Sequence, residues 1–355
     1  MISYFRKGRF IMYFDYSAST PINKKALEAY NKSILEHSAN PQSDHSPAKK
    51  SLHQINEDIQ GFKNSLNFNT HHITFTQNAT HANQMIINHI LKIPKTMHVI
   101  CGPFEHPSVV QVLSKLQRQG LKIDVCEIDE EGLIDIDHFK TLIKPETSLI
   151  CISMVDSELG INQNIEKLKL LTPNIPFLCD ITQAIGKVPI HLNKVDYLTF
   201  SAHKFYGPKG LGGIFHLNGL NDRQGTMPTE LIHASYVALE ETLKSDRNKV
   251  VSYKDTLIHA FSKMHHVKIN SPDTTVPHVL NISIDTSKTQ NLITYFSDQG
   301  IYVSRGVACS NSHFSQNIFT LTQSIKHAET SVRISLSHLT TPQEIETFIQ
   351  VIKEL

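Results

Sequence analysis

No stretch of the 355-residue sequence is apolar for long enough to cross a lipid bilayer as a helix. The first residues, MISYFRKGRFIMYF, carry basic side chains but lack the continuous apolar core of a secretory signal peptide. We therefore expect a cytoplasmic protein with no membrane partner. The segment before Met12 has the character of an extension, so Met12 is a second candidate for the natural start.

An excess of charge of one sign is also lacking. The 34 Lys and Arg residues nearly balance the 33 Asp and Glu residues, which leaves a formal net charge of +1 with His counted as neutral. This balance provides no strong field for nonspecific binding to nucleic acid or to an anionic membrane. We therefore expect no direct nucleic-acid partner, although the composition is compatible with a local basic patch.

Cysteine is scarce, and its five residues are an odd number. This count argues against a disulfide framework and favours a reducing compartment. Four cysteines lie in or beside short apolar runs and are interpreted as small buried side chains: Cys101, Cys126, Cys151 and Cys179. Cys309 differs, because its surroundings, SRGVACSNSH, are small and polar and predict a loop. The 21 His residues are scattered without the spacing or Cys partners of a zinc site, so no metal is expected.

Short apolar runs of β-forming residues alternate with amphipathic helical patterns through the first two thirds of the chain. The predicted strands are residues 72–75, 98–101, 122–128, 148–155, 176–179, 197–201 and 212–217. Helical patterns lie between several of them, as at 107–120 and 164–171. This alternation predicts an α/β fold with a mostly parallel, seven-stranded sheet covered by helices on both faces.

The pattern changes in the last third of the chain. The predicted elements there are a helix at 229–245, strands at 279–284, 301–304 and 331–337, and a terminal helix at 342–355. We interpret this part as a smaller α+β domain. The predicted boundaries are 13–235 for the large domain and 236–355 for the small one, and residues 1–30 are expected to pack with the small domain.

Polar segments follow the predicted strands at almost every carboxyl end. They are TQNATHAN, PFEHPS, DSELG, DITQ and AHKFYGP, in sequence order. In open α/β sheets, ligands bind just beyond the carboxyl ends of the strands. The sequence therefore predicts one functional site built from these segments.

These segments resemble the class V aminotransferase family and, within it, the cysteine desulfurases. The resemblance covers nearly the whole chain and rests on YFDYSASTP (13–21), ANPQSDH (39–45), FTQNATHAN, FEHPSV, DITQAIGKVPI (180–190), FSAHKFYGPKGLGG (200–213), GVACS (306–310) and SVRISLSHLTT (331–341). It implies fold type I of the pyridoxal 5′-phosphate (PLP)-dependent transferases, with PLP as the cofactor.

The resemblance implies that Lys204 holds PLP as a Schiff base. A lysine amine can form such an imine, and PLP then acts as an electron sink. Lys204 follows an apolar strand and precedes a Tyr-Gly-Pro turn, which suits a side chain that faces inward. Lys187 and Lys209 also lie near glycines, and a surface position is the simpler interpretation of both.

Three further side chains are implied to contact the cofactor ring. A carboxylate keeps the pyridine nitrogen protonated, and Asp180, directly after its strand, fits this role; a turn or cap residue is the alternative. Gln183 resembles the residue that donates to the ring oxygen O3′. His106 resembles the imidazole that stacks on the ring and moves protons; a solvated loop His is the alternative.

The phosphate group needs hydrogen-bond donors and a helix N-terminus. Ala79 and Thr80 begin a helical pattern and can offer backbone amides and a hydroxyl, while Ser201 and His203 flank Lys204. Thr226 resembles a threonine that reaches the partner's phosphate across a dimer interface, which implies a homodimer; a helix cap is the alternative.

Arg333 lies in the alternating strand pattern SVRISLS, where a planar guanidinium could bind the carboxylate of an amino acid with two hydrogen bonds. An edge-strand surface arginine is the alternative. Asn40 resembles the asparagine of the family's N-terminal substrate-side loop, and Ser157 stands near the substrate where the family usually has Asn.

The reaction implied is removal of sulfur from L-cysteine to give L-alanine and a persulfide on Cys309, which passes sulfur to an acceptor protein in iron–sulfur cluster assembly or tRNA thiolation. Only a thiolate can attack the substrate sulfur. The catalytic residues implied are Lys204, Cys309 and His106. The alternatives are another class V reaction, such as selenocysteine lyase or transaminase, and a degenerate PLP-binding relative with little turnover.

The chain departs from the family at several of these motifs. Ser157 has a shorter side chain than the usual Asn, and the segment before Thr226 is shorter than in typical desulfurases. Asn78 and His81 replace the usual Gly and Glu, and Asn is the milder change because it tolerates positive φ.

Overall fold

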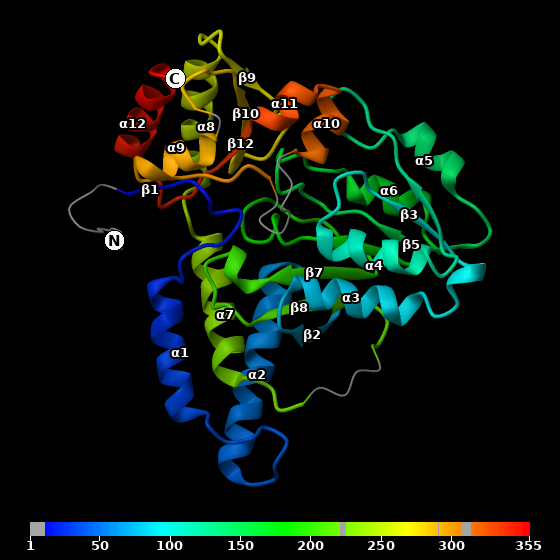
Figure 1. Ribbon diagram of the computed structural model, residues 1–355. Helices are drawn as coiled ribbons and strands as arrows, with labels where there is room; N and C mark the ends of the chain where they lie inside the picture. The colour runs from blue at the N-terminus through cyan, green and yellow to red at the C-terminus, as the bar shows by residue number, and fades with distance from the viewer. Residues whose placement is uncertain (1–10, 221–224, 290, 307–313) are drawn as a thin grey trace.

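A mostly parallel sheet of seven strands forms the centre of the computed structural model, which describes residues 11–220, 225–289, 291–306 and 314–355 (Figure 1). The order across the sheet is β2-β8-β7-β6-β5-β3-β4, and only β8 runs antiparallel to its two neighbours. The strands are β2 (His72–Thr76), β3 (His98–Cys101), β4 (Lys122–Val125), β5 (Thr147–Cys151), β6 (Phe177–Asp180), β7 (Tyr197–Ser201) and β8 (Gly212–His216). The predicted α/β fold of seven strands is therefore confirmed.

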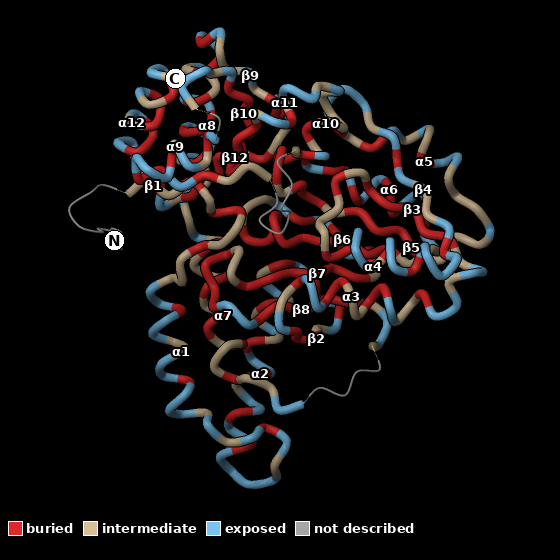
Figure 2. Tube along the Cα trace, in the orientation of Figure 1, coloured by how far each residue is buried: buried red, intermediate tan, exposed pale blue. Residues whose placement is uncertain are grey.

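Helices cover both faces of this sheet, and alternate side chains of each strand point to opposite layers. In β5, Leu149 and Cys151 join the apolar cluster under α3 and α4, whereas Ile150 joins the cluster under α2, α6 and α7. Figure 2 shows the central strands buried between these layers. The helices are α1 (Lys24–Glu36), α2 (Ser46–Ser65), α3 (Ala79–Ile90), α4 (Pro107–Gln117), α5 (Ile136–Leu142), α6 (Ile165–Leu171) and α7 (Thr229–Leu243), with short 3₁₀ turns η1 (Pro94–Thr96) and η2 (Ala202–Lys204).

A second, smaller sheet occupies the C-terminal part of the chain. Its antiparallel order is β12-β10-β9, and its apolar side packs against helices that include α8 and α12. The elements of this part are α8 (Arg247–Phe261), β9 (Val267–Ile269), β10 (Val279–Ile284), α9 (Leu292–Asp298), β11 (Ile301–Tyr302), α10 (Gln316–Thr322), α11 (Ile325–Thr330), β12 (Ser331–Ser335) and α12 (Pro342–Lys353). The N-terminal strand β1 (Met12–Tyr13) pairs in parallel with β11, so this segment joins the C-terminal part.

The predicted domain boundary between residues 235 and 236 falls inside α7, which is one continuous helix. Its buried side chains Ile232, Ala238 and Leu239 belong to the apolar cluster of the large sheet. The division into two domains stays a prediction, and the end of α7 is the better place to draw it.

The four cysteines outside the 307–313 segment are buried and free, as their apolar surroundings predicted: Cys101, Cys126, Cys151 and Cys179. Burial raises the pKa of the Cys126 thiol to about 12. None of these four is therefore a thiolate near neutral pH. The described helices include none with both the length and the apolar character that crossing a membrane requires.

Lys169 in α6 is expected to be a large contributor to stability. Its amine is buried and donates to the Asp196 carboxylate at 2.6 Å and to the carbonyls of Pro173 and Ile175 at 3.1 and 2.9 Å. The Lys169→Met variant should lose about 3 kcal/mol of unfolding free energy, because it leaves Asp196 without its cation. Urea unfolding would measure this, with exposed Lys167→Met in the same helix as the control; equal stability of the two variants would contradict it.

Candidate active site

A cavity of about 230 Å³ lies beyond the carboxyl ends of the parallel strands, where the sequence predicted the site. It brings together ten of the predicted site residues: Ala79, Thr80, His106, Ser157, Asp180, Gln183, Ser201, His203, Lys204 and Arg333. The segments that supply most of them are far apart in the sequence and meet because their strands end at one edge of the central sheet, whereas Arg333 comes from β12 of the smaller sheet.

Lys204 ends the 3₁₀ turn η2, directly after β7, and its amine is held by the N-terminal segment. Its Nζ donates to the backbone carbonyls of Ser17 and Ala18 at 2.6 and 2.8 Å. The same N-terminal segment is fastened to η2 from the other side, because the Thr20 hydroxyl donates to the His203 carbonyl at 2.9 Å. The amine is thus fixed at the cavity wall by neutral acceptors.

Asp180, the last residue of β6, presents a carboxylate whose two oxygens are both oriented by donors. Its Oδ1 accepts from the Thr182 amide at 2.8 Å, and its Oδ2 accepts from Asn83 Nδ2 at 2.9 Å. Asn83 lies on α3 and is itself positioned by the Thr199 hydroxyl, which donates to its Oδ1 at 2.6 Å. This arrangement fixes the orientation of the carboxylate, which can still accept a hydrogen bond from an N–H group of a ligand.

His106 is the N-cap of α4, and its hydrogen bonds define where its proton sits. The backbone amide of Ser108 donates to Nδ1 at 3.1 Å, so Nδ1 acts as an acceptor in this structure. Burial lowers the pKa of His106, and the nearby Lys204 cation lowers it further, against the opposing charge of Asp180. The neutral ring therefore carries its proton on Nε2.

The N-terminus of α3 forms the end of the cavity that suits an anion. The Ala79 amide donates to Ser201 Oγ at 2.7 Å, and Asn78 caps the helix by accepting from the His81 amide at 2.8 Å. Asn78 is extended, with φ −174°, so the positive φ anticipated at this position is not used. Gly212 of β8 permits the close approach, since a Cβ there would lie 2.6 Å from the Asn78 Cα.

His203 lies on the same side of the cavity. Burial, together with the neighbouring lysines, lowers its pKa to about 4, so the ring is neutral near neutral pH. Its Nδ1 lies 3.4 Å from Ser19 Oγ. The neutral His203, the Ser201 hydroxyl and the N-terminus of α3 together suit an anion, and none of these three groups carries a formal positive charge.

Arg333 of β12 is almost fully buried, at 1% exposed, and is not an edge-strand surface residue. Its Nη2 pairs with the Asp15 carboxylate at 2.7 Å, and its Nη1 donates to the Ser157 carbonyl at 3.1 Å. Its Nε is buried with no partner in the described part of the chain. The guanidinium is thus fixed at the cavity, with donor capacity left for a ligand.

Gln183 links the cavity to the residues behind it. Its Nε2 donates to the Ser17 carbonyl at 3.0 Å, and its Oε1 accepts from Lys187 Nζ at 3.4 Å. One N–H of the amide remains for a ligand oxygen.

The remaining predicted site residues lie elsewhere. Asn40 and Thr226 do not line the cavity, but they contact each other, with Asn40 Nδ2 3.4 Å from the Thr226 hydroxyl. Thr226 is not a helix cap, since α7 has Pro228 at that position. Cys309 lies outside the described residues.

Several residues that the sequence motifs did not single out orient the site. Asp15 pairs with Arg333, the Ser17 carbonyl accepts from Lys204, and the Thr182 amide donates to Asp180. A further chain of hydrogen bonds connects Asp180 with His106 through Asn83 and Ser108. Asp15 and Ser17 stand in YFDYSASTP, and Asn83 ends TQNATHAN, so each lies within one of the motifs that carry the family resemblance.

Comparison with known proteins agrees with this arrangement of the site. The aminotransferase class-V family matches residues 12–231 and 223–348, which is most of the chain. The chain belongs to this family. It is 31% identical to the cysteine desulfurase IscS of Methylobacillus flagellatus, over 96% of this chain and 91% of the relative, and 30% identical to the cysteine desulfurase IscS of Neisseria gonorrhoeae over the same shares. The cysteine desulfurase branch is thereby shown, and the chain is an enzyme of the PLP-dependent sulfurtransferase type.

Solved structures support the fold. A NIFS-like protein matches with a TM-score of 0.88 at 24% identity, covering 97% of this chain and 99% of its own. A structure described as SspA in complex with cysteine matches with a TM-score of 0.80 at 27% identity, covering 93% of this chain and 100% of its own. Fold type I is therefore confirmed for this chain.

Proposed function

We propose that this chain is a cysteine desulfurase that converts L-cysteine to L-alanine and carries the sulfur on Cys309. The observation that supports it best is the convergence of Lys204, Asp180, His106 and Arg333 on one cavity. A structurally similar protein, SspA, has been solved in complex with cysteine. A degenerate site would have no physical need to keep all four groups positioned by hydrogen bonds.

The cavity fits PLP. Three buried polar atoms at its wall, Ser17 Oγ, Thr182 Oγ1 and Arg333 Nε, have no partner among the described residues and can serve a bound ligand. Lys204 would hold the cofactor covalently, Asp180 would face the ring nitrogen and His106 the ring. The α3 N-terminus with Ser201 and His203 would hold the phosphate, and Gln183 the ring oxygen. PLP supplies an electron sink for a carbanion at the substrate α-carbon.

The residues of the chain supply binding and proton movement. As a free amine, Lys204 moves the α-proton of the substrate. Once protonated, its ammonium group can donate to the Ser17 and Ala18 carbonyls at the cavity wall. The Nε2–H of His106 can donate to a ligand oxygen without bringing a positive charge. The Cys309 thiolate would attack the sulfur of L-cysteine: the S–S bond forms as the Cβ–S bond breaks, the electron pair of that bond goes to the substrate β-carbon, and this carbon takes up a proton to give alanine.

We assign Arg333 to the substrate carboxylate. The Arg333→Lys variant should raise the KM for L-cysteine at least about tenfold, because an ammonium cannot keep the Asp15 and Ser157 contacts and also bind a carboxylate with two hydrogen bonds. The visible absorbance of bound PLP should be retained. Steady-state kinetics would measure the change; a fall in kcat with KM unchanged would contradict the assignment.

The protein is proposed to act as a homodimer. Asn40 and Thr226 are exposed, contact each other and lie away from the cavity of their own chain, which suits residues that complete the site of a partner subunit. The sulfur acceptor is proposed to be a protein of iron–sulfur cluster assembly or of tRNA thiolation. The presence of Ser157 in place of Asn leaves selenocysteine as an alternative substrate.

The decisive experiment is incubation of the purified protein, reconstituted with PLP, with L-cysteine and a reductant. Stoichiometric alanine and sulfide are the expected products. 3-Mercaptopyruvate without alanine would indicate transamination, because that reaction leaves the C–S bond intact, and faster turnover of selenocysteine would indicate a lyase of that substrate. Visible PLP absorbance without any product would indicate the degenerate relative.

A further inference from the structure

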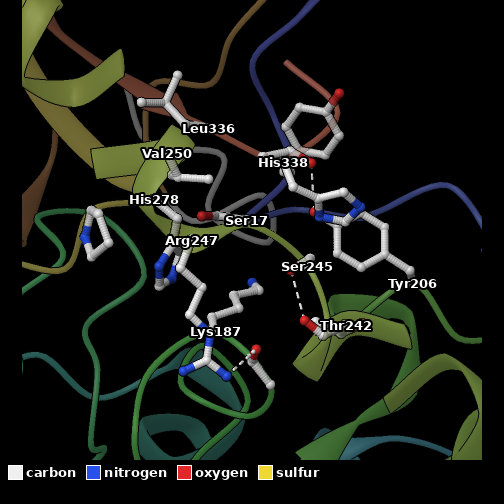
Figure 3. Close-up of a pocket in the computed structure, with 14 residues that line it drawn as sticks. Ser17, Lys187, Tyr206, Thr242, Ser245, Arg247, Val250, His278, Leu336 and His338 are labelled. Atoms are coloured by element: carbon white, nitrogen blue, oxygen red, sulfur yellow. Dashed lines mark hydrogen bonds between the residues drawn. The ribbon is translucent and has the colours of Figure 1, made fainter. Parts of the chain in front are cut away.

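A second, smaller cavity lies behind the active site, and cationic side chains gather around it. Its volume is about 40 Å³, and Ser17 separates it from the PLP cavity, since this residue lines both. Figure 3 shows Lys187, Arg247 and His278 on one side of it, each from a different part of the chain. Lys187 follows β6, Arg247 begins α8 and His278 precedes β10.

The cations of this cavity lack counter-ions. None of the described residues that line it is Asp or Glu, and Lys187 and Arg247 form no ion pair with a described carboxylate. Among the described residues, Arg247 Nη2 donates to the Gly186 carbonyl at 3.3 Å, and Lys187 Nζ donates to Gln183 Oε1 at 3.4 Å. Lys187 and Arg247 are partly withdrawn from water, and cations in such places are normally paired, so this arrangement favours an anion.

His278 adds an independent observation. It is 5% exposed, and no described residue makes a hydrogen bond of standard geometry with either ring nitrogen, although the Gln183 backbone lies near enough to raise its pKa. Burial, and next the Lys187 charge, lower the pKa of His278 well below its ordinary value. A neutral imidazole carries one N–H, and no described residue offers that N–H a hydrogen bond of standard geometry, so it is available to a ligand in the cavity.

Lys187 is not the surface residue that the sequence suggested. Its side chain as a whole is half-buried, but loss of hydration at the amine, followed by repulsion from Lys204 and Arg333, lowers its pKa to about 7. The position of Arg247 is also unfavourable for a cation. It occupies the first turn of α8, where the helix dipole favours an anion.

The size of the cavity limits the occupant. One water needs roughly 10–15 Å³ of such volume, so about 40 Å³ admits a monatomic anion with one or two waters but excludes a phosphate ester or an amino acid. We propose that this cavity is a binding site for a small monovalent anion of chloride size, held by Lys187, Arg247 and His278.

The site is connected to the active site by hydrogen bonds. Lys187 donates to Gln183, Gln183 donates to the Ser17 carbonyl, and Lys204 donates to the same carbonyl. An anion beside Lys187 therefore offsets the repulsion between Lys187 and Lys204 and fixes the orientation of the Gln183 amide. Anion binding at this cavity can be measured without cysteine, so it is independent of the reaction proposed above.

The test uses the PLP-loaded protein and bromide as a heavy substitute for chloride. Crystals soaked in sodium bromide should show one anomalous peak in this cavity, within hydrogen-bond distance of Lys187 Nζ and Arg247. In solution, the unfolding midpoint temperature should rise with chloride and saturate, at an ionic strength kept constant with gluconate, which is too large for the cavity.

The variants separate a bound ion from general salt effects. Lys187→Met and Arg247→Gln should each raise the half-saturating chloride concentration at least about tenfold. The exposed-site variant Lys194→Met should respond to chloride like the unmodified chain. If a variant fails to fold, the bromide map of the unmodified protein decides by itself. A cavity that holds only water, or a chloride response identical in Lys187→Met, would overturn the proposal.

Discussion

Replacement of Lys204 by alanine is expected to abolish turnover, with a loss of at least about 10⁴-fold, because the residue serves as both the covalent anchor and the proton carrier. It is the only lysine among the described residues that line the cavity. PLP should then bind without a covalent link and be removable by gel filtration. Borohydride reduction followed by peptide mass spectrometry should find the cofactor on the Lys204 peptide of the unmodified protein.

Lys209 provides the matched control for this experiment. It lies five residues away in the same motif but is exposed and does not line the cavity. Lys209→Ala should therefore keep both the covalent adduct and turnover. An adduct on Lys187 or Lys209, or residual turnover of Lys204→Ala near that of the unmodified chain, would contradict the assignment.

The central strands could be predicted because they are buried on both faces and therefore read as short apolar runs. Their ends were less predictable. The run at 122–128 and the run at 148–155 continue past Val125 and Cys151, where the strands end, because Cys126 and Ile152 are buried in loops. An apolar run shows which residues are buried, and in both segments the buried residues continue beyond the last residue that pairs in the sheet. The predicted strand at 301–304 contains β11, which ends at Tyr302, whereas β1, with two residues, is too short to have a periodic pattern.

The site was predictable to the extent that topology alone brings it together. His106, Asp180 and Lys204 follow parallel strands, and such strand ends meet at one edge of the sheet. Asp15 and Ser17 follow no strand of that sheet. They reach Arg333 and Lys204 because β1 pairs with β11 and Asp15 bridges to Ser335 of β12, contacts across nearly the whole chain. The role of Asn83 likewise depends on how α3 packs over β6, which no local pattern records.

Replacement of Cys309 by alanine should stop sulfide release while leaving the absorbance of bound PLP unchanged. The residue is proposed to accept sulfur rather than to bind the cofactor, so its loss should affect only the transfer step. The fall in sulfide formation should be at least about 100-fold, in line with the loss of a reacting nucleophile. Sulfide and alanine would be quantified together in the presence of a reductant, and mass spectrometry would show the added sulfur atom on the Cys309 peptide of the unmodified protein.

The buried cysteines make this test specific. Cys126 is 3% exposed, and burial holds its thiol protonated, so Cys126→Ala should retain sulfide production. A transaminase would lose nothing in either variant, because its reaction needs no thiolate. Normal sulfide release by Cys309→Ala would therefore exclude the persulfide route. Equal losses in both variants would point to a structural effect rather than to chemistry at Cys309, because a buried thiol that stays protonated cannot take over the attack on the substrate sulfur.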